Sequence, residues 1–331
     1  MKQKNSGVIN VHKEKGYTSH DVVAIIRKIF REKTGHTGTL DPNATGVLPV
    51  CIGRTTKLAD YFAAEDKDYT AEIVFGMRTD TCDIWGEDLG GDVLGGEDLG
   101  GAAPVAWASS PPLGGRPAPK PPQGSTAPLT PTLEGVKLIA ESFLGEILQV
   151  PPMYSAVKVG GRKLYELARK GQVIERKARR VVIHGLNVRC ESVAEGEKFF
   201  LDVSCSKGTY IRSLCADIGD ALGCGAVMGD LVRTRSGRFS LGDALTIEEI
   251  KAMAERGEAD KLIVPPDKLL PYPSACVTEA GLSKARNGNP LPSELVRCDG
   301  GGDNYWMYDP DGDLIGLFCE KNGVFRAEVM L

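Results

Sequence analysis

One carboxylate in this 331-residue chain stands in a stretch of unusual composition. Residues 35–50 read Gly-His-Thr-Gly-Thr-Leu-Asp-Pro-Asn-Ala-Thr-Gly-Val-Leu-Pro-Val and contain a single acid, Asp41. Because Pro42 disfavours helical dihedral angles at the preceding residue, the spacing predicts a tight turn that presents Asp41. A carboxylate presented in this way suits nucleophilic or acid–base chemistry. On spacing alone, an Asp-Pro turn without any chemistry is the more common outcome.

A second feature is a strongly basic segment, residues 158–180. It contains nine Lys or Arg residues against two Glu, although the whole chain has a net charge of −4. A local positive field of this kind attracts a phosphate backbone. Tyr154 and Tyr165 are interleaved with the basic residues. The segment therefore favours an RNA or DNA partner over a merely solvated helix face.

The elements around these features follow no regular strand–helix–strand repeat. Residues 8–11 are expected to form a strand, and Thr18 with Asp21 forms a capping box before an apolar helical stripe that reaches Phe30. Gly35, just past Lys33, is the expected C-cap of that helix. Further strands are expected at 67–75, 181–183 and 199–204, and a helix at 211–222. The pattern predicts an α+β class, with a large domain built around a mixed, largely antiparallel sheet and flanking helices.

Two breaks in composition divide the chain. Residues 86–131 contain the hexapeptide Gly-Glu-Asp-Leu-Gly-Gly twice and then nine prolines, so we expect a flexible low-complexity insertion at the surface. Residues 263–272 are expected to form a linker. Short strands at 305–308, 314–318 and 324–331 then predict a small all-β domain over 273–331. The large domain accordingly spans 1–262.

Several protein classes are excluded by what the sequence lacks. The nine cysteines are scattered without a C-x-x-C pair, which argues against a disulfide scaffold and a zinc ribbon. Residues 1–6 lack the apolar region of a signal peptide, and no apolar run of about 18 residues occurs. We therefore expect neither a signal peptide nor a membrane span, and the cytoplasm is the expected location. The four histidines show no metal-ligand spacing, and no Walker A or G-x-G-x-x-G loop occurs. We therefore expect neither a metal nor a cofactor.

The stretch around Asp41 is the first of five sequence blocks that cover nearly all of residues 7–240. The blocks are 38–49; 67–69 with 76–86; 149–158 with 161–169; 205–224; and 231–237. In this order they resemble the TruB family of tRNA pseudouridine synthases. The tail resembles, more loosely, the PUA-like domain of bacterial members. The insertion at 86–131 departs from the family, because it is longer and more repetitive than the usual connection.

The resemblance implies isomerisation of uridine 55 in the T-arm of tRNA to pseudouridine. In this reaction the C1′–N1 bond breaks, the uracil rotates, and a C1′–C5 bond forms. Residues 1–262 would then be the catalytic domain and 273–331 an RNA-binding domain. The implied partner is tRNA, with no nucleotide cofactor and no membrane, and a monomer is expected. A secondary RNA-folding activity is also compatible with the resemblance.

The resemblance also implies roles for individual residues. Asp41 would be the nucleophile, and Arg212 would pair with it and keep it ionised. Tyr69 would stack on the target base and could take a proton.

Three more residues are expected to bind the RNA. Tyr210 and Leu231 would line the pocket, and His36 would stack into the arm that the flipped base has left.

Each of these residues also has a simpler interpretation. Tyr69 alternates with Ala71, which fits an ordinary core tyrosine on a strand, and His36 could be a turn residue. Arg212 could form a surface pair with Asp217, although their spacing is poor for a helix.

Two other function classes remain in view. A module that only binds or folds RNA would need none of the catalytic residues. An N-glycoside hydrolase that uses Asp41 and water would need a second carboxylate about 6.5–9.5 Å away, and the sequence around Asp41 offers none.

Overall fold

The computed structural model describes residues 6–89 and 131–331, apart from 156, 173 and 195. The chain divides into two compact units. The first unit combines Met1–Ala64 with Gly237–Leu331, and the second unit is Glu65–Ser236. The domain boundaries expected from the sequence stay a prediction.

The first unit begins with a small sheet and one long helix. Its elements before the C-terminal module are β1 (Gly7–Lys13), α1 (Ser19–Phe30), β2 (Thr34–His36), β3 (Thr45–Ile52), η1 (Gly53–Leu58), α2 (Ala59–Ala64), β11 (Phe239–Ser240), η2 (Leu241–Asp243), α6 (Ile247–Glu255), η3 (Ala259–Leu262) and η4 (Pro266–Lys268). Strands β1 and β3 are antiparallel from Gly7↔Ile52 to Lys13↔Gly46. Strand β2 also pairs with β3 in the antiparallel sense.

Helix α1 confirms its predicted start and corrects its predicted end. The capping box between Thr18 and Asp21 is present. The helix stops at Phe30, because Arg31 adopts the left-handed conformation, with φ 55°, and acts as the C-cap. The expected cap at Gly35 is wrong, since that residue belongs to β2.

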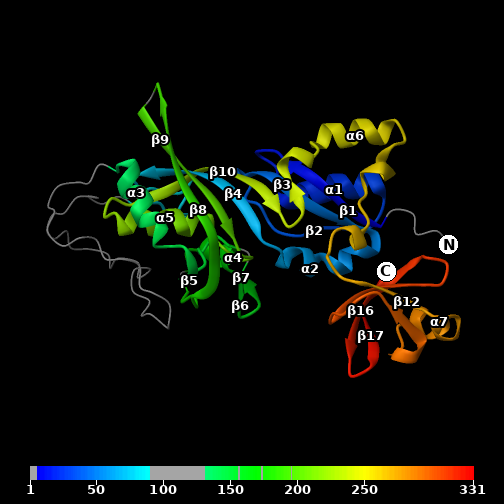
Figure 1. The fold of residues 1–331 in the computed structure, drawn as a ribbon. Helices are drawn as coiled ribbons and strands as arrows, with labels where there is room; N and C mark the ends of the chain where they lie inside the picture. Colours follow the sequence, from blue (N-terminus) through cyan, green and yellow to red (C-terminus); the bar gives the residue numbers. More distant parts are fainter. Residues whose placement is uncertain (1–5, 90–130, 156, 173, 195) are drawn as a thin grey trace. The chain divides into compact units, whose positions relative to one another are not determined.

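The C-terminal module of the first unit is a six-stranded sheet (Figure 1, orange to red). Its elements are β12 (Ser274–Val277), α7 (Glu279–Arg286), β13 (Leu291–Pro292), η5 (Ser293–Leu295), β14 (Val296–Cys298), β15 (Asn304–Tyr308), β16 (Leu314–Lys321) and β17 (Val324–Met330). The strand order is β13-β17-β16-β15-β12-β14. The β12–β15 pair is parallel. The three predicted strands are confirmed, and α7 is a helix that the turn-rich sequence did not reveal.

The C-terminal module shares a core with the N-terminal part of the same unit. Trp306, Leu317 and Val329 of the module lie in one buried cluster with Val8 and Leu58 from the N-terminal part. Polar contacts follow the same seam, since Arg54 donates to the Leu331 carbonyl at 2.7 Å. The same cluster includes Val47 and Cys51 of β3, the strand that follows the loop of Asp41.

The second unit is built on one antiparallel sheet with helices beside it (Figure 1). Its elements are β4 (Lys67–Phe75), α3 (Leu133–Glu141), β5 (Gly145–Gln149), β6 (Lys158–Val159), β7 (Arg162–Lys163), α4 (Leu164–Ala168), β8 (Arg179–Val193), β9 (Gly196–Cys205), α5 (Ile211–Ala221) and β10 (Ala226–Ser236). The strands β10, β4, β9, β8 and β5 lie in this order, and each neighbouring pair is antiparallel. Together with the first unit, this confirms the predicted α+β class.

The two faces of this sheet differ because side chains alternate along each strand. Ala71 and Ile73 of β4 and Leu201 and Val203 of β9 are buried on one face. The opposite face carries polar pairs such as Thr70, which donates to Asp202 at 2.8 Å. Tyr69 shares the buried face, because it lies two residues before Ala71.

Two features expected from composition fall partly outside the described residues. The insertion 86–131 is described only at its ends, where the Leu89 N–H donates to the Arg78 carbonyl at 2.9 Å; residues 90–130 lie outside the described part. The basic segment forms the hairpin β6–β7, the short helix α4 and an irregular stretch before β8. Within the described residues, no helix is long and apolar enough to cross a membrane.

Candidate active site

The loop between β2 and β3 holds Asp41 half-buried in a turn. The Asp41 carbonyl accepts the N–H of Ala44 at 3.1 Å, which closes the turn. The preceding residue, Leu40, is fixed by Ser19 at the start of α1. The Ser19 hydroxyl accepts the Leu40 N–H at 2.9 Å and donates to the Leu40 carbonyl at 3.1 Å. The predicted turn is therefore present and is anchored on its N-terminal side.

The C-terminal side of the turn is anchored by a fully buried lysine, Lys13. Its Nζ donates to the carbonyls of Pro42 at 3.1 Å, Ala44 at 2.6 Å and Glu14 at 3.1 Å. Since burying an ammonium is costly unless its donors are satisfied, these three bonds explain how Lys13 is tolerated. No local sequence pattern marks Lys13 as an anchor, because its acceptors in the loop lie 29 and 31 residues further along the chain.

His36 lies at the end of β2, on the approach to the same loop. Its ring meets that of His20 edge-on, with 5.4 Å between the centroids. His36 therefore lies in a strand and its ring pairs with that of His20, so the alternative interpretation of His36 as a turn residue is wrong. Its role in stacking on RNA stays a prediction.

In the second unit, the buried Arg212 lies at the start of α5. Its Nη1 donates to the Thr81 carbonyl at 3.1 Å and its Nη2 to the Tyr154 carbonyl at 2.8 Å. The Asp83 carboxylate lies 3.6 Å from Nη1. Because Arg212 is buried and held in this way, the alternative of a surface ion pair is wrong.

Asp83 is itself held by the turn in which it lies. Its Oδ1 accepts the Thr81 hydroxyl at 2.7 Å and the Trp85 N–H at 3.1 Å. Thr79 donates to the Asp83 carbonyl at 2.6 Å. The carboxylate therefore reaches Arg212 from a rigid position. Asp83 lies in the second block of the family resemblance, which gave no role for this residue.

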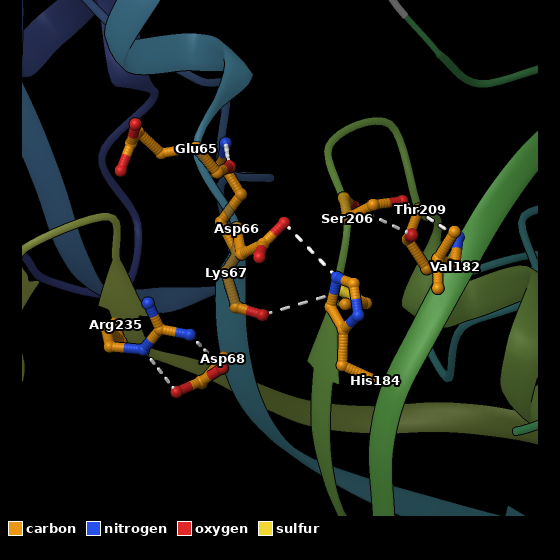
Figure 2. Close-up of polar contacts among 10 residues, drawn as sticks. Glu65, Asp66, Lys67, Asp68, Val182, His184, Ser206, Thr209 and Arg235 are labelled. Atoms are coloured by element: carbon orange, nitrogen blue, oxygen red, sulfur yellow. Dashed lines mark hydrogen bonds and ion pairs between the residues drawn. The ribbon is translucent and has the colours of Figure 1, made fainter. Parts of the chain in front are cut away.

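Tyr210 is the N-cap residue of α5 and is fixed through its backbone. The buried side chain of Gln149 donates to the Tyr210 carbonyl at 2.9 Å and accepts the Tyr210 N–H at 2.7 Å. The turn before it is tied to β8, because the Val182 N–H donates to the Ser206 hydroxyl at 2.8 Å (Figure 2). These bonds position Tyr210 and Arg212 together at one end of the helix.

Tyr69 and Leu231 lie on the same face of the sheet, on the neighbouring strands β4 and β10. Tyr69 is opposite Arg233, and Leu231 is opposite Ala71. Register shifts in β10, one before Leu231 and one after Arg233, bracket this stretch. Tyr69 is half-buried and Leu231 is buried. The structure thus places Tyr69 and Leu231 as diagonal neighbours on one face of the sheet, and their contact with the base stays a prediction.

The start of β4, just before Tyr69, is held from both sides (Figure 2). The Asp66 carboxylate lies 3.3 Å from His184 Nε2 of β8. On the other side, Asp68 accepts two bonds from Arg235 of β10, at 2.5 and 2.8 Å. These contacts join β4 to elements on either side of it and limit the movement of the strand that carries Tyr69.

Three titratable side chains of the second unit have pKa values shifted from their usual ones. The pKa of Lys67 is lowered to about 8, mainly by burial and secondly by the nearby charge of Arg233. On α5, the pKa of Asp217 is raised to about 7, mainly by burial and secondly by the Asp220 carboxylate. Burial raises the pKa of Asp220 to about 6, although Arg78 lies 2.6 Å from its carboxylate and acts in the opposite direction.

The candidate site residues are thus distributed over both units. Asp41 and His36 are in the first unit. Tyr69, Tyr210, Arg212 and Leu231 are in the second unit. The expected pairing of Asp41 with Arg212 would be between residues of different units, and it stays a prediction. Among the described residues, no group of three or more His, Cys, Asp or Glu side chains could hold a metal ion.

Comparison with known proteins covers nearly the whole chain. The tRNA pseudouridine synthase B of Alkaliphilus oremlandii is 39% identical over 98% of this chain and 94% of its own length. The protein of the same name from Halalkalibacterium halodurans is 37% identical over 98% of this chain and 97% of its own length. A crystal structure of a Cbf5–Nop10–Gar1 complex matches with a TM-score of 0.63 and 27% identity, over 98% of this chain and 84% of that one.

Family models match the same regions as the sequence blocks. The "TruB family pseudouridylate synthase (N terminal domain)" matches residues 27–93 and 124–211. The "tRNA pseudouridylate synthase B C-terminal domain" matches residues 212–271. Both matches include residues of the candidate site. The chain belongs to the TruB family of pseudouridylate synthases.

Proposed function

We propose that this protein converts uridine 55 in the T-arm of tRNA to pseudouridine, with Asp41 as the nucleophile. The reaction is an isomerisation, so its atoms balance within the substrate. The C1′–N1 bond breaks, C1′ bonds to C5, the C5 proton leaves, and N1 takes up a proton. The enzyme needs no co-reactant and acts as a monomer in the cytoplasm.

Asp41 attacks the sugar or assists departure of the uracil, and Arg212 keeps the carboxylate ionised and correctly directed. Tyr69 stacks on the flipped base and is the candidate to take its proton. Tyr210 and Leu231 close the pocket around the uracil, and His36 fills the position that the base has left.

The observation that carries this proposal is the double anchoring of the Asp41 turn. Ser19 fixes the residue before Asp41, and the buried Lys13 fixes the residues after it. A reactive carboxylate needs this kind of preorganisation, because a small displacement from the reacting carbon costs much of the rate.

The experiment is tritium release from a tRNA transcript that carries [5-³H]uridine, measured for the wild type and for Asp41→Asn. A second transcript with cytidine in place of uridine 55 serves as the substrate control. We expect release by the wild type from the first transcript alone, and none by Asp41→Asn although this variant still binds tRNA. Release by Asp41→Asn at the wild-type rate would overturn the assignment of the nucleophile. Binding without release by the wild type would leave an RNA-binding function instead.

A further inference from the structure

The turn that follows β4 presents a group of large apolar side chains to solvent. Nine large apolar side chains are exposed within the part of the chain that the structure describes, and three of them, Ile84, Trp85 and Leu89, lie within six consecutive residues. Their exposed fractions are 39%, 42% and 52%. A single exposed aliphatic side chain needs no explanation, whereas a tryptophan in such a group indicates a contact surface.

The backbone that carries Trp85 is firmly held. Its N–H donates to Oδ1 of Asp83 at 3.1 Å. On either side of it, the Ile84 N–H donates to the Met228 carbonyl of β10 at 3.0 Å, and the Gly86 N–H donates to the Asp83 carbonyl at 3.2 Å. The indole is therefore presented from a preorganised turn, which lowers the entropy that it loses on binding.

The same turn reaches the candidate active site. The Asp83 carboxylate lies 3.6 Å from the guanidinium of Arg212. Trp85 follows Asp83 by two residues, and two residues of chain span at most about 7 Å. If the target uridine is bound at Arg212, as the proposed function requires, the indole is within reach of the nucleotide that adjoins it.

The charges around Trp85 favour RNA over a protein as the partner. Arg212 also donates to the Tyr154 carbonyl at 2.8 Å, so the turn lies beside the segment that leads into the basic residues 158–180. Arg176 of that basic segment donates to the Pro151 carbonyl at 3.1 Å. These cations attract the phosphates of an RNA and repel a basic protein segment.

The turn itself suits a base and not a phosphate. It carries the carboxylates of Asp80, Asp83, Glu87 and Asp88, which repel phosphate oxygens. An uncharged base is not repelled in this way, and its flat face matches the indole. A nucleotide whose phosphates lie towards residues 158–180 and whose base faces the turn satisfies both conditions.

We propose that Trp85 stacks on an unpaired base of the substrate RNA, at a nucleotide that adjoins the target uridine. This inference rests on the proposed function and adds a binding position to it. Stacking on an aromatic side chain tolerates every base, because each base has a π face. Trp85 therefore contributes affinity for the RNA and leaves the chemistry to Asp41 and its neighbours.

The test compares Trp85→Ala and Trp85→Phe with the wild type in steady-state tritium release and in binding of a T-arm stem-loop. Both variants keep the backbone N–H that binds Asp83, so the turn should stay folded. For Trp85→Ala we expect KM and Kd to rise about tenfold with kcat unchanged, because a stack present in both the bound substrate and the transition state contributes equally to each. Trp85→Phe should recover most of the affinity. Leu138→Ala, at a 70% exposed position on α3, is the matched control and should keep the wild-type constants.

Two further stem-loops locate the base. Each lacks one base, on the 5′ or on the 3′ side of the target uridine, and the difference in Kd between the wild type and Trp85→Ala should vanish for one of them. A difference that persists with both, or a fall in kcat at unchanged KM, would overturn the proposal. Unchanged KM and Kd in Trp85→Ala would also overturn it and would leave the apolar group for a protein partner. Failure of the wild type to release tritium would overturn the proposed function instead, and the Kd values would still decide whether Trp85 stacks on RNA.

Discussion

The Asp83 carboxylate lies 3.6 Å from the guanidinium of Arg212, and both side chains are buried. The two backbone carbonyls that Arg212 reaches, those of Thr81 and Tyr154, fix the plane of the guanidinium group. Asp83 adds the negative charge that a buried cation requires. The guanidinium of Arg212 is thus held in one orientation by the protein alone, without bound RNA.

Asp83→Asn should therefore lower the rate of tritium release about 10- to 100-fold while tRNA binding changes little. The substitution keeps the size of the side chain but removes the charge that balances Arg212, so the guanidinium is less firmly oriented. Asp80→Asn is the matched control, because the Asp80 carboxylate instead accepts the backbone N–H of Glu87 at 2.9 Å. Equal rates for the two variants would show that Asp83 does not position Arg212.

Lys13→Met should disorder the turn that carries Asp41. Methionine has a similar length but donates no hydrogen bond, so the carbonyls of Pro42 and Ala44 lose a buried partner. We expect a loss of stability of about 2–4 kcal/mol and a fall of about 100-fold in tritium release. The measurements are chemical denaturation and single-turnover release.

Lys15→Met is the control for this experiment, since Lys15 is an exposed lysine two residues away. A variant at Lys13 that keeps the wild-type rate per folded molecule would show that the anchor serves folding alone.

The sequence predicted the elements whose signals are local. The capping box of α1 and the full extent of β4, Lys67–Phe75, were correct, because capping residues and strand alternation lie within a few positions of each other. The buried strand β3, Thr45–Ile52, was missed. Its glycine and proline resemble those of a loop, and its burial depends on β1 and β2, which pair with it.

The groups that hold the candidate site residues in place could not be predicted from the sequence, for the same physical reason. The bond from Arg212 to the Thr81 carbonyl spans 131 residues of the chain. Lys13 looks like any lysine after a strand until its acceptors are in place. The blocks of the family resemblance marked Asp41 and Arg212. The contacts that hold them join side chains to backbone carbonyls far away in the chain, Arg212 to Thr81 and Lys13 to Ala44, and such contacts leave no local sequence pattern.

Trp306→Ala should destabilise the N-terminal part of the first unit as well as the C-terminal module. Trp306 is buried in the cluster that the two parts share, and its Nε1 donates to the Leu270 carbonyl at 3.2 Å. Truncating an aromatic side chain in a core costs about 3–5 kcal/mol. Hydrogen exchange measured by peptide should show lost protection in β3 as well as in β16.

Phe325→Ala provides the comparison, because Phe325 is buried in a second cluster formed within the module. We expect this variant to lower protection in the module and to affect β3 less. Unchanged protection of β3 in Trp306→Ala would mean that the two parts unfold independently in spite of their shared core.

Asp217 should make the protein less stable as the pH rises from about 4 to about 7. Burial first, and the Asp220 carboxylate second, raises the pKa of Asp217 to about 7, above its usual value of 3.8. Between these two values the folded state holds a proton that the unfolded state releases, so stability falls as the pH increases from about 4 to 7.

Asp217→Asn removes this titration. Relative to the variant, the wild-type melting temperature should therefore fall by a few degrees, as an order of magnitude, between pH 5 and pH 8. Asp303→Asn, at an exposed position, should follow the wild type across the whole range. A constant difference between the wild type and Asp217→Asn would show that Asp217 does not titrate in this interval.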